Sequence, residues 1–564
     1  MTAIEAFLEL LAQVSVRYIF GNPGTTELPL NDALAADGRF QYILGLQEVP
    51  VMAMADGYAM ASGQLGVVNL HACCGLGNAM GMLYNAYREG TPLLVTAGQQ
   101  DRRLLLEEPI LAGRMTDVAG PWTKWSYEVQ RADDLPVAVR RAIQCALTPP
   151  RGPVFLSLPV DLQRETISNT ELVAVPIPNP LIRPPAQAVA TAVRLMREAR
   201  QPAILAGSRV TEMGAIEALV RLAELWGAPV YSESGTTHGR LAFPADHPLN
   251  GQGLPLWSPE VRQKLAPFDV VLVTGMDLLR QYVYHEPARA IPEHIRLIHL
   301  DEDPWQLNKN YPAEVAIWGH TRVGLEELAQ SLDQALTDEE RRAAQQRVAY
   351  WSRLHGEARY KLEQQIRQRW SDRPMAPQVL MGALAHALPK DVAVIEEAVT
   401  TTNTTLERLG ALRNTSGYFG HRGWALGWGL GCAVGVQLAW PDRPVLAVLG
   451  EGAALYGIVG LWSAAHYRLP VKIIICNNAQ YQILKIGARH AGLPQAVAGR
   501  FVGMDLEPPA IDMVALAQSL GVRACRIGEP DELIETLRRS WDDPQPWLID
   551  VPISRHTPPR LEYG

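Results

Sequence analysis

The sequence predicts an α/β protein of three domains, each a mostly parallel sheet flanked by helices. Short apolar runs alternate with helical patterns along the chain, which is typical of βαβ units. The length of 564 residues exceeds what one hydrophobic core normally supports. A proline-rich stretch at 175–185 disfavours helix and predicts a linker between domains. We therefore expect domains at 1–178, 186–340 and 375–564, with a smaller Rossmann-like domain in the middle.

Each block contains four apolar runs with the length and composition of strands. They lie at 16–24, 40–48, 66–74 and 91–99, then at 201–208, 228–234, 268–275 and 296–304, and finally at 391–397, 443–452, 470–478 and 546–552. A charged segment from Asp338 to about Trp370 predicts a solvated helix that connects the second block to the third. The first and third blocks are of similar size and the same α/β type.

Composition excludes several classes of function. The formal net charge of −8 gives no basic surface for nucleic acid or for an anionic membrane. The six cysteines show no CxxC spacing, which favours buried free thiols in a reduced cytoplasm. The first 13 residues carry Glu5 and Glu9 without a basic segment, so they predict an amphipathic helix rather than a signal peptide. We expect a cytoplasmic protein.

One uncharged run could be mistaken for a membrane span. Residues 423–440 are 18 residues without a charge, near the lower limit for a spanning helix. The run is rich in glycine, and Pro441 and Asp442 follow it directly. We therefore expect a helix buried on all sides in the core of the protein.

The third block carries a motif suited to an anion and a hard cation. One apolar strand ends in Gly450-Glu451-Gly452, and the next ends in Asn477-Asn478. A carboxylate and a carboxamide at the carboxyl ends of neighbouring parallel strands meet in the crevice where α/β sheets bind ligands. Such oxygen donors suit Mg²⁺, and glycines before a helix allow backbone N–H groups to approach phosphate. The pattern predicts a cradle for a diphosphate and Mg²⁺.

The segment GEGAALYGIVGLWSAAHYRLPVKIIICNNAQY resembles the binding motif of the thiamine-diphosphate-dependent enzymes, the acetolactate synthase and pyruvate decarboxylase superfamily. The resemblance implies that thiamine diphosphate and Mg²⁺ are the cofactors. It makes Glu451 and Asn478 side-chain ligands of the metal and gives Gln480 a backbone carbonyl ligand. It also places Gly452 and Ala453 next to the diphosphate. Glu451 departs from the family, most of whose members have Asp at this position.

The first block contains the residues that the family uses for proton transfer. By the resemblance, Glu48 in LGLQEVPVMAMADGYA protonates N1′ of the aminopyrimidine. The segments FGNPGTTELP, NLHACCGLGNAMG and TKWSYEV are most similar to benzoylformate decarboxylase, whose pattern assigns catalytic roles to Thr25 and His71. A carboxylate or an imidazole that merely caps the following helix is the alternative for Glu48 and for His71. The spacing GxGxxxG after His71 indicates close helix packing rather than a dinucleotide fingerprint.

The same resemblance assigns further positions. Leu426 matches the apolar residue beneath the bent cofactor, and Thr400 matches a hydroxyl contact to the diphosphate. The residues after the Asn pair fall at the cofactor and the substrate pocket, namely Tyr481, Ile483 and Leu484. Benzoylformate decarboxylase also has a histidine from its middle domain. Val283 stands at that position here, with His285 two residues away.

The resemblance implies non-oxidative decarboxylation of an aromatic or branched 2-oxo acid to an aldehyde, through an enamine. Sites shared between two chains are expected, in a homodimer or homotetramer. The alternatives are a carboligase or lyase that makes or breaks a carbon–carbon bond, a non-catalytic paralogue that has lost metal binding through Glu451, and a nicotinamide-dependent oxidoreductase. Whether the middle domain binds a flavin stays open.

Overall fold

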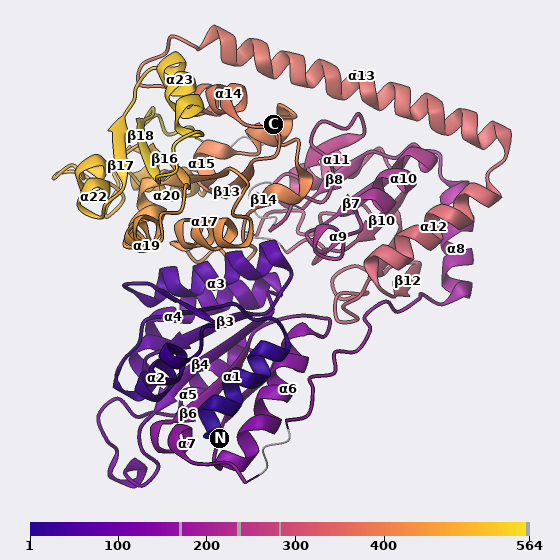
Figure 1. Cartoon of the computed structure of the whole chain (residues 1–564). Helices are drawn as coiled ribbons and strands as arrows, with labels where there is room; N and C mark the ends of the chain where they lie inside the picture. The colour runs from indigo at the N-terminus through magenta and orange to yellow at the C-terminus, as the bar shows by residue number, and fades with distance from the viewer. Residues whose placement is uncertain (169–171, 234–238, 281–283, 560–564) are drawn as a thin grey trace.

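The chain folds around three six-stranded sheets in which every paired strand is parallel (Figure 1). The computed structural model describes residues 1–168, 172–233, 239–280 and 284–559. Because parallel strands need crossover connections, helices cover the faces of each sheet. The three-domain α/β architecture expected from the sequence is confirmed.

The first sheet has the strand order β2-β1-β3-β4-β6-β5. Its strands are β1 (Tyr18–Gly21), β2 (Gln41–Leu44), β3 (Gly66–Leu70), β4 (Leu93–Gln99), β5 (Ser126–Glu128) and β6 (Val154–Pro159). Its α-helices are α1 (Ala3–Gln13), α2 (Leu28–Ala36), α3 (Glu48–Ser62), α4 (Ala72–Glu89), α5 (Met115–Ala119), α6 (Leu135–Leu147) and α7 (Val160–Arg164). Helix α1 is amphipathic, as expected, and Thr2 and Glu5 form a capping box at its start.

The third sheet repeats this topology with the order β14-β13-β15-β16-β18-β17. Its strands are β13 (Ala393–Glu397), β14 (Tyr418–Phe419), β15 (Val445–Gly450), β16 (Lys472–Asn477), β17 (Arg523–Arg526) and β18 (Trp547–Pro552). Its helices are α14 (Pro377–Ala387), α15 (Val399–Thr402), α16 (Thr405–Arg408), α17 (Trp428–Ala439), α18 (Glu451–Tyr456), α19 (Gly460–His466), α20 (Gln482–His490), α21 (Pro494–Val497), α22 (Met513–Ser519) and α23 (Pro530–Ser540). The first and third blocks therefore share one topology.

The middle sheet has the order β12-β11-β10-β7-β8-β9, the doubly wound order of Rossmann domains. Its strands are β7 (Pro202–Ala206), β8 (Val230–Ser232), β9 (Asn250–Gly253), β10 (Val270–Thr274), β11 (Arg296–Asp301) and β12 (Val315–Trp318). Its helices are α8 (Ala186–Glu198), α9 (Arg209–Glu212), α10 (Ile216–Trp226), α11 (Ser258–Leu265) and α12 (Thr321–Ala335).

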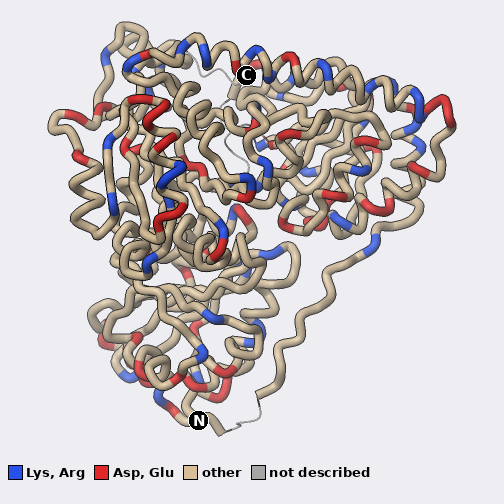
Figure 2. Tube along the Cα trace, turned by 45° about the horizontal axis from the view of Figure 1, so that its top comes forward, with Lys and Arg blue, Asp and Glu red and all other residues tan. Residues whose placement is uncertain are grey.

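Two connectors join the domains as the sequence predicts. Residues 172–185 run without helix or strand from the first domain to the second (Figure 1). Helix α13 (Asp338–Gln368) then spans the middle and C-terminal domains. Acidic and basic residues are mixed along α13 (Figure 2), and only Ala344, Leu362 and Ile366 are buried. Along its length α13 is fixed to the middle domain by hydrogen bonds from Arg347, His355 and Arg359 to backbone oxygens.

Helices α3 and α17 form the main contact between the first and third domains. The expected buried helix within 423–440 is α17, and a Cβ on its Gly435 would come within 2.7 Å of Tyr58 N and would also overlap Met54 O. Glycines at this contact let the two backbones approach closely. Beside it, Trp428 Nε1 donates a hydrogen bond of 2.6 Å to buried Asp56.

No described helix has the length and apolar character needed to cross a bilayer. The cysteines are all free, but only Cys432 and Cys476 are buried. The expectation of buried thiols is therefore wrong for Cys74, which is exposed on α4, and incomplete for the half-buried others. Apolar neighbours in the sequence do not decide which face of a helix carries a given residue.

Candidate active site

The carboxyl ends of β15 and β16 bring Glu451 and Asn478 together. Glu451 Oε1 and Asn478 Oδ1 each lie 3.1 Å from the backbone nitrogen of Gln480, so both oxygens accept from the same N–H group. Both side chains are buried. A cavity of about 220 Å³ reaches Glu451 and Asn478. The two oxygen donors that the sequence singles out therefore converge, although Gln480 presents its N–H to them.

The Glu451 carboxyl is buried, and no basic side chain forms an ion pair with it among the described residues. Burial raises its pKa to about 7, although backbone N–H groups, including that of Gln480, oppose this shift. No group of three or more His, Cys, Asp or Glu side chains suited to a metal occurs among the described residues. A magnesium ion held by one carboxylate, one carboxamide and phosphate oxygens needs no such group. The donor set and the uncompensated carboxyl fit Mg²⁺ bound with a diphosphate.

The packing around this cradle leaves no room for a side chain at Gly452. A Cβ on Gly452 would lie 2.7 Å from Tyr481 Cε1, so the tyrosine ring packs where a side chain would stand. Ala453 follows in α18 and is almost fully buried. Beyond Tyr481, Ile483 is half-buried and Leu484 is 47% exposed on α20. These positions place apolar side chains next to the cradle, on an open face of the chain.

Leu426 stands on a turn that a buried carboxylate holds. Glu397, at the end of β13, accepts hydrogen bonds from the backbone nitrogens of Gly427, Trp428 and Gly429 at 2.9–3.1 Å. Gly427 has a φ of 99°, a conformation that favours glycine. Leu426, directly before this turn, is 36% exposed. Glu397 was not singled out from the sequence. Its position at the end of a predicted strand, close to Thr400, could have marked it as a site residue.

Glu48 begins α3 and is held by two asparagines. Asn22 donates to its Oε1 at 3.2 Å, and Asn78 donates to its Oε2 at 3.0 Å. The Glu48 side chain is buried. The capping bond of α3 comes instead from Gln47, which accepts from Val49 N, so the alternative that Glu48 is a cap is not supported. Asn22 and Asn78 were not singled out from the sequence.

His71 is bound to a buried carboxylate. Its Nδ1 lies 2.9 Å from Glu27 Oε2 and 3.4 Å from Thr26 Oγ1. His71 precedes α4, but its side chain makes no capping bond, so the helix-cap alternative is wrong. The Glu27 carboxylate also accepts from the backbone nitrogens of Gly24 and Gly98 at 2.9 and 2.8 Å. Because a carboxylate only accepts, Nδ1 carries the proton and Nε2 is left to act on other groups.

Thr25 and Thr26 differ in their surroundings. Thr25 is exposed, and no hydrogen bond of its hydroxyl occurs within the described part of the chain, whereas Thr26 is buried against His71 and Glu27. Glu27 was also missed by sequence reasoning. The signal was available, because Glu27 follows Gly24 by three residues in FGNPGTTELP and closes the turn that presents Thr25.

Of the two middle-domain residues considered for a histidine role, only His285 lies among the described residues. Val283 lies outside the described residues. His285 packs against Trp257 and against His490 at the end of α20, with ring centroids 5.0 Å apart in both cases. Its Nε2 is buried without a hydrogen-bond partner among the described residues. His285 thus contacts the helix that carries Ile483.

The Rossmann crevice of the middle domain is occupied by side chains. Arg209, after β7, donates to Asp277 at 2.9 Å and to Asp301 at 2.8 Å, and all three residues are buried. A Cβ on Gly207 would lie 2.7 Å from Met276 Cα. The point between β7 and β10, where this topology usually binds a nucleotide, is filled by these groups.

Comparison with known proteins assigns the chain to one class. The chain matches the models of the thiamine pyrophosphate enzymes, with the N-terminal TPP-binding domain at residues 1–116, the central domain at 189–328 and the C-terminal TPP-binding domain at 399–551. The protein belongs to the thiamine pyrophosphate enzyme family.

Within this family, the chain is similar over its full length to a benzoylformate decarboxylase of Pseudomonas aeruginosa. The two are 34% identical, with 98% of each chain covered. It is 28% identical to a probable acetolactate synthase large subunit of Methanocaldococcus jannaschii, with 98% of this chain and 92% of the relative covered. A 4-hydroxybenzoylformate decarboxylase of Rhodococcus jostii has a similar solved structure, with a TM-score of 0.85, 30% identity and 100% of each chain covered.

Proposed function

We propose that the protein catalyses the thiamine-diphosphate-dependent, non-oxidative decarboxylation of a 2-oxo acid with an aromatic or branched side chain, and releases the aldehyde. The observation that carries this proposal is the pairing of His71 with buried Glu27 in the domain that also holds Glu48. Decarboxylation to an aldehyde needs a proton at the carbon that loses carbon dioxide, and an imidazole supplies protons near neutral pH. The similarity to two aromatic 2-oxo-acid decarboxylases supports the substrate class.

The C-terminal cradle would hold the cofactor. Glu451 and Asn478 would bind Mg²⁺ through their side chains, and Gln480 through its carbonyl. Gly452, Ala453 and Thr400 would face the diphosphate, and Leu426, Tyr481 and Ile483 would contact the rest of the cofactor. Bound thiamine diphosphate supplies a nucleophilic carbon that adds to the ketone and an electron sink for the loss of carbon dioxide.

Glu48 would move a proton at N1′ of the cofactor's pyrimidine ring. The amide groups of Asn22 and Asn78 each donate to one Glu48 oxygen, so they fix the carboxyl group and hold its charge when it is ionised. Burial excludes water from this exchange. The two asparagines therefore position Glu48 rather than react themselves.

His71 would deliver the proton that replaces carbon dioxide in the product. With Nδ1 bonded to Glu27, Nε2 is the exchangeable site of the ring. The Glu27 carboxylate stabilises the imidazolium and fixes the ring orientation. Thr25, exposed beside this pair, would contact the substrate carboxylate.

We also propose a homodimer or homotetramer in which two chains complete each site. Large apolar side chains are exposed around both half-sites, as expected of surfaces that another chain covers. In the first domain these are Leu28, Leu104, Leu106 and Ile110, and in the third they are Tyr456, Leu484, Val497 and Val502. The segment with Leu106 and Ile110 ends at Gly113, where a Cβ would overlap Cys73, two residues after His71. Sedimentation velocity would test the assembly, and a monomer at micromolar concentration would contradict it.

Thermal unfolding tests cofactor binding. Metal-stripped protein is heated with thiamine diphosphate, with Mg²⁺, and with both. Saturation at about 100 times Kd stabilises the fold by about 2.7 kcal/mol, so the Tm should rise only when both are present. An unchanged Tm at millimolar cofactor would favour the non-catalytic paralogue.

Product analysis tests the reaction. The protein loaded with cofactor is incubated with benzoylformate, 4-hydroxybenzoylformate, a branched 2-oxo acid and pyruvate, and both carbon dioxide and aldehyde are measured. Equal amounts of the two products support decarboxylation. A 2-hydroxy ketone or 2-hydroxy acid as main product would instead support the carboligase, a candidate favoured by the similarity to acetolactate synthase.

A further inference from the structure

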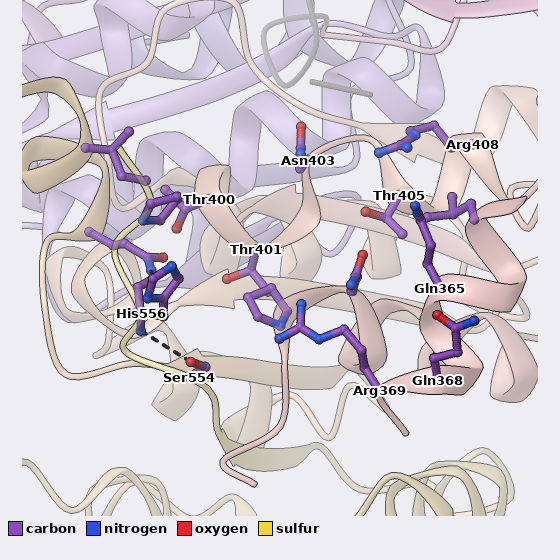
Figure 3. Close-up of a pocket in the computed structure, with 16 residues that line it drawn as sticks. Gln365, Gln368, Arg369, Thr400, Thr401, Asn403, Thr405, Arg408, Ser554 and His556 are labelled. Atoms are coloured by element: carbon purple, nitrogen blue, oxygen red, sulfur yellow. Dashed lines mark hydrogen bonds between the residues drawn. The ribbon is translucent and has the colours of Figure 1, made fainter. Parts of the chain in front are cut away.

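A second cavity lies beside the cofactor cradle in the C-terminal domain (Figure 3). It has a volume of about 520 Å³ and sits between the end of α13, helices α15, α16 and α20, and the C-terminal segment at 554–558. Its wall includes Thr400, Thr401 and Gln482, but neither Glu451 nor Asn478 is among the residues that line it. The cavity therefore adjoins the proposed cradle and shares Thr400 with it, but its other lining residues are not among those assigned to the diphosphate or to Mg²⁺.

The lining has an unusual charge for an acidic protein. None of its sixteen residues is an aspartate or a glutamate, although the chain carries a net charge of −8. Arg369, Arg408 and His556 are its titratable members, and nine further side chains are neutral hydrogen-bonding groups. A cavity rich in donors and free of carboxylates favours an anionic ligand.

Arg408 is the main source of this charge. It ends α16 and is half-buried, and no hydrogen bond or ion pair of its guanidinium occurs within the described ranges. Its neighbour Glu407 is buried, and burial raises the pKa of that carboxyl to about 7, which weakens its compensation of the arginine. A half-buried guanidinium without a carboxylate partner is costly unless a ligand completes its hydrogen bonds.

A second arginine reaches the cavity from another element. Arg369, at the end of α13, donates through Nε to Asp372 at 2.8 Å, so Asp372 compensates part of its charge. Figure 3 shows Arg369 and Arg408 entering from different walls of the cavity. Donors on separate walls suit a ligand with several oxygen atoms, such as a carboxylate or a phosphate.

Hydrogen bonds also connect one wall of the cavity to the proposed metal-binding loop. Gln482 donates to the backbone oxygen of His556 at 2.6 Å, and Gln480 donates to the backbone oxygen of Arg555 at 2.9 Å. The C-terminal segment is thus tied to the loop that carries Gln480. A ligand against His556 and Gln482 would touch residues whose positions also shape the cradle.

We propose that this cavity binds a small oxyanion, either a carboxylate or a phosphate, with Arg408 as its principal ligand and Arg369 as a second. The site is centred on Arg408 rather than on Glu451 and Asn478, and we expect it to bind the anion in addition to the cofactor. The proposal concerns binding and is independent of which 2-oxo acid the protein decarboxylates.

Isothermal titration of the protein saturated with thiamine diphosphate and Mg²⁺ tests the proposal. Inorganic phosphate and malonate are the two probes, each corrected by a titration into the same magnesium buffer. Saturable binding of either one is expected, and their relative affinity tells whether phosphate or carboxylate is preferred. Arg408→Gln should weaken binding about tenfold or more, because a hydrogen bond to a charged group is lost.

Arg367→Gln is the matched control. Arg367 is exposed on α13, two residues before Arg369, and does not line the cavity. Unfolding curves for all variants establish that they are folded. The proposal is overturned if neither probe binds, if the Arg408→Gln and Arg367→Gln proteins bind equally well, or if binding occurs only without cofactor, since the anion would then merely fill the cradle.

Discussion

The Nδ1 atom of His71 lies 2.9 Å from Oε2 of Glu27, a carboxylate that is almost completely buried. The same carboxylate accepts the backbone N–H groups of Gly24 and Gly98. It therefore joins the loop after β1, the end of β4 and the histidine that precedes α4. One side chain fixes both the local backbone and the direction of the imidazole.

The first prediction concerns this pair. Glu27→Gln turns one of the two carboxylate oxygens into an amide donor. At the Oε2 position this donor would face both Nδ1–H of His71 and the N–H of Gly24, and only the remaining oxygen would still accept the N–H of Gly98. We expect kcat/KM to fall about 10²-fold, the usual size of a general acid–base contribution. A steady-state pH profile should also change shape, which a purely structural defect would not cause. An unaltered profile at full activity would contradict the role given to Glu27.

The second prediction concerns Glu48. Glu48→Gln cannot donate a proton to N1′, so activity should fall by about 10² or more while the Tm rise with cofactor persists. Activity within about tenfold of the parent would remove Glu48 from the mechanism. Glu5→Gln, at an exposed position of α1, is the control and should leave turnover unchanged.

The third prediction concerns Asp56 at the contact between α3 and α17. Burial raises the pKa of Asp56 to about 7, opposed by the nearby hydroxyl of Thr91 and by the hydrogen bond from Trp428. The folded state then holds a proton between pH 4 and pH 7 that the unfolded state has released. The stabilising effect of this proton is complete below the pKa that Asp56 has in the unfolded state, and it is lost as the pH rises through about 7.

Asp56→Asn removes this ionisation and keeps an oxygen for Trp428 Nε1. The variant should lose less stability than the parent between pH 6 and pH 8, measured as Tm in one buffer series. The difference should be about 1.4 kcal/mol, because only about one pH unit of this window lies below the folded pKa of about 7. Parallel curves for the two proteins would rule out ionisation of Asp56 in that window.

The fourth prediction concerns Arg209. Arg209→Met leaves Asp301 buried without its cation and removes the nearest of the cations around Asp277, and this should cost about 3–5 kcal/mol of unfolding free energy. Arg194→Ala breaks an exposed pair with Glu198 on α8 and should cost about 0.5 kcal/mol or less. Urea unfolding compares the two variants. Equal losses would show that the buried ion pairs do not hold the middle domain together.

The fifth prediction concerns the approach of α3 to α17. Gly435→Ala puts a methyl group against backbone atoms of α3 and should destabilise the fold by about 1–3 kcal/mol. Gly487→Ala, in α20, meets no atom within 4 Å and should gain up to about 1 kcal/mol through helix propensity. Differential scanning calorimetry gives both values, and opposite signs are expected.

Much of the architecture follows from local pattern. The apolar run at 443–452 becomes β15, and the run at 470–478 becomes β16, because buried parallel strands are recognisable from composition alone. The convergence of Glu451 and Asn478 follows from the same rule, since carboxyl ends of parallel strands share one edge. Glu48 and His71 were found through motifs that surround them in the sequence.

The partners of these residues were decided only by tertiary structure. Asn78 reaches Glu48 across 30 positions, and Glu27 reaches His71 across 44. Glu397 holds the turn before α17 from 30 residues away, and Arg209 closes the middle crevice through Asp301, 92 residues on. The sequence by itself determined the fold class, the strands and the family motif, because these depend on local composition and spacing. Which buried charges meet depends on how helices and sheets pack, and no local pattern contains that information.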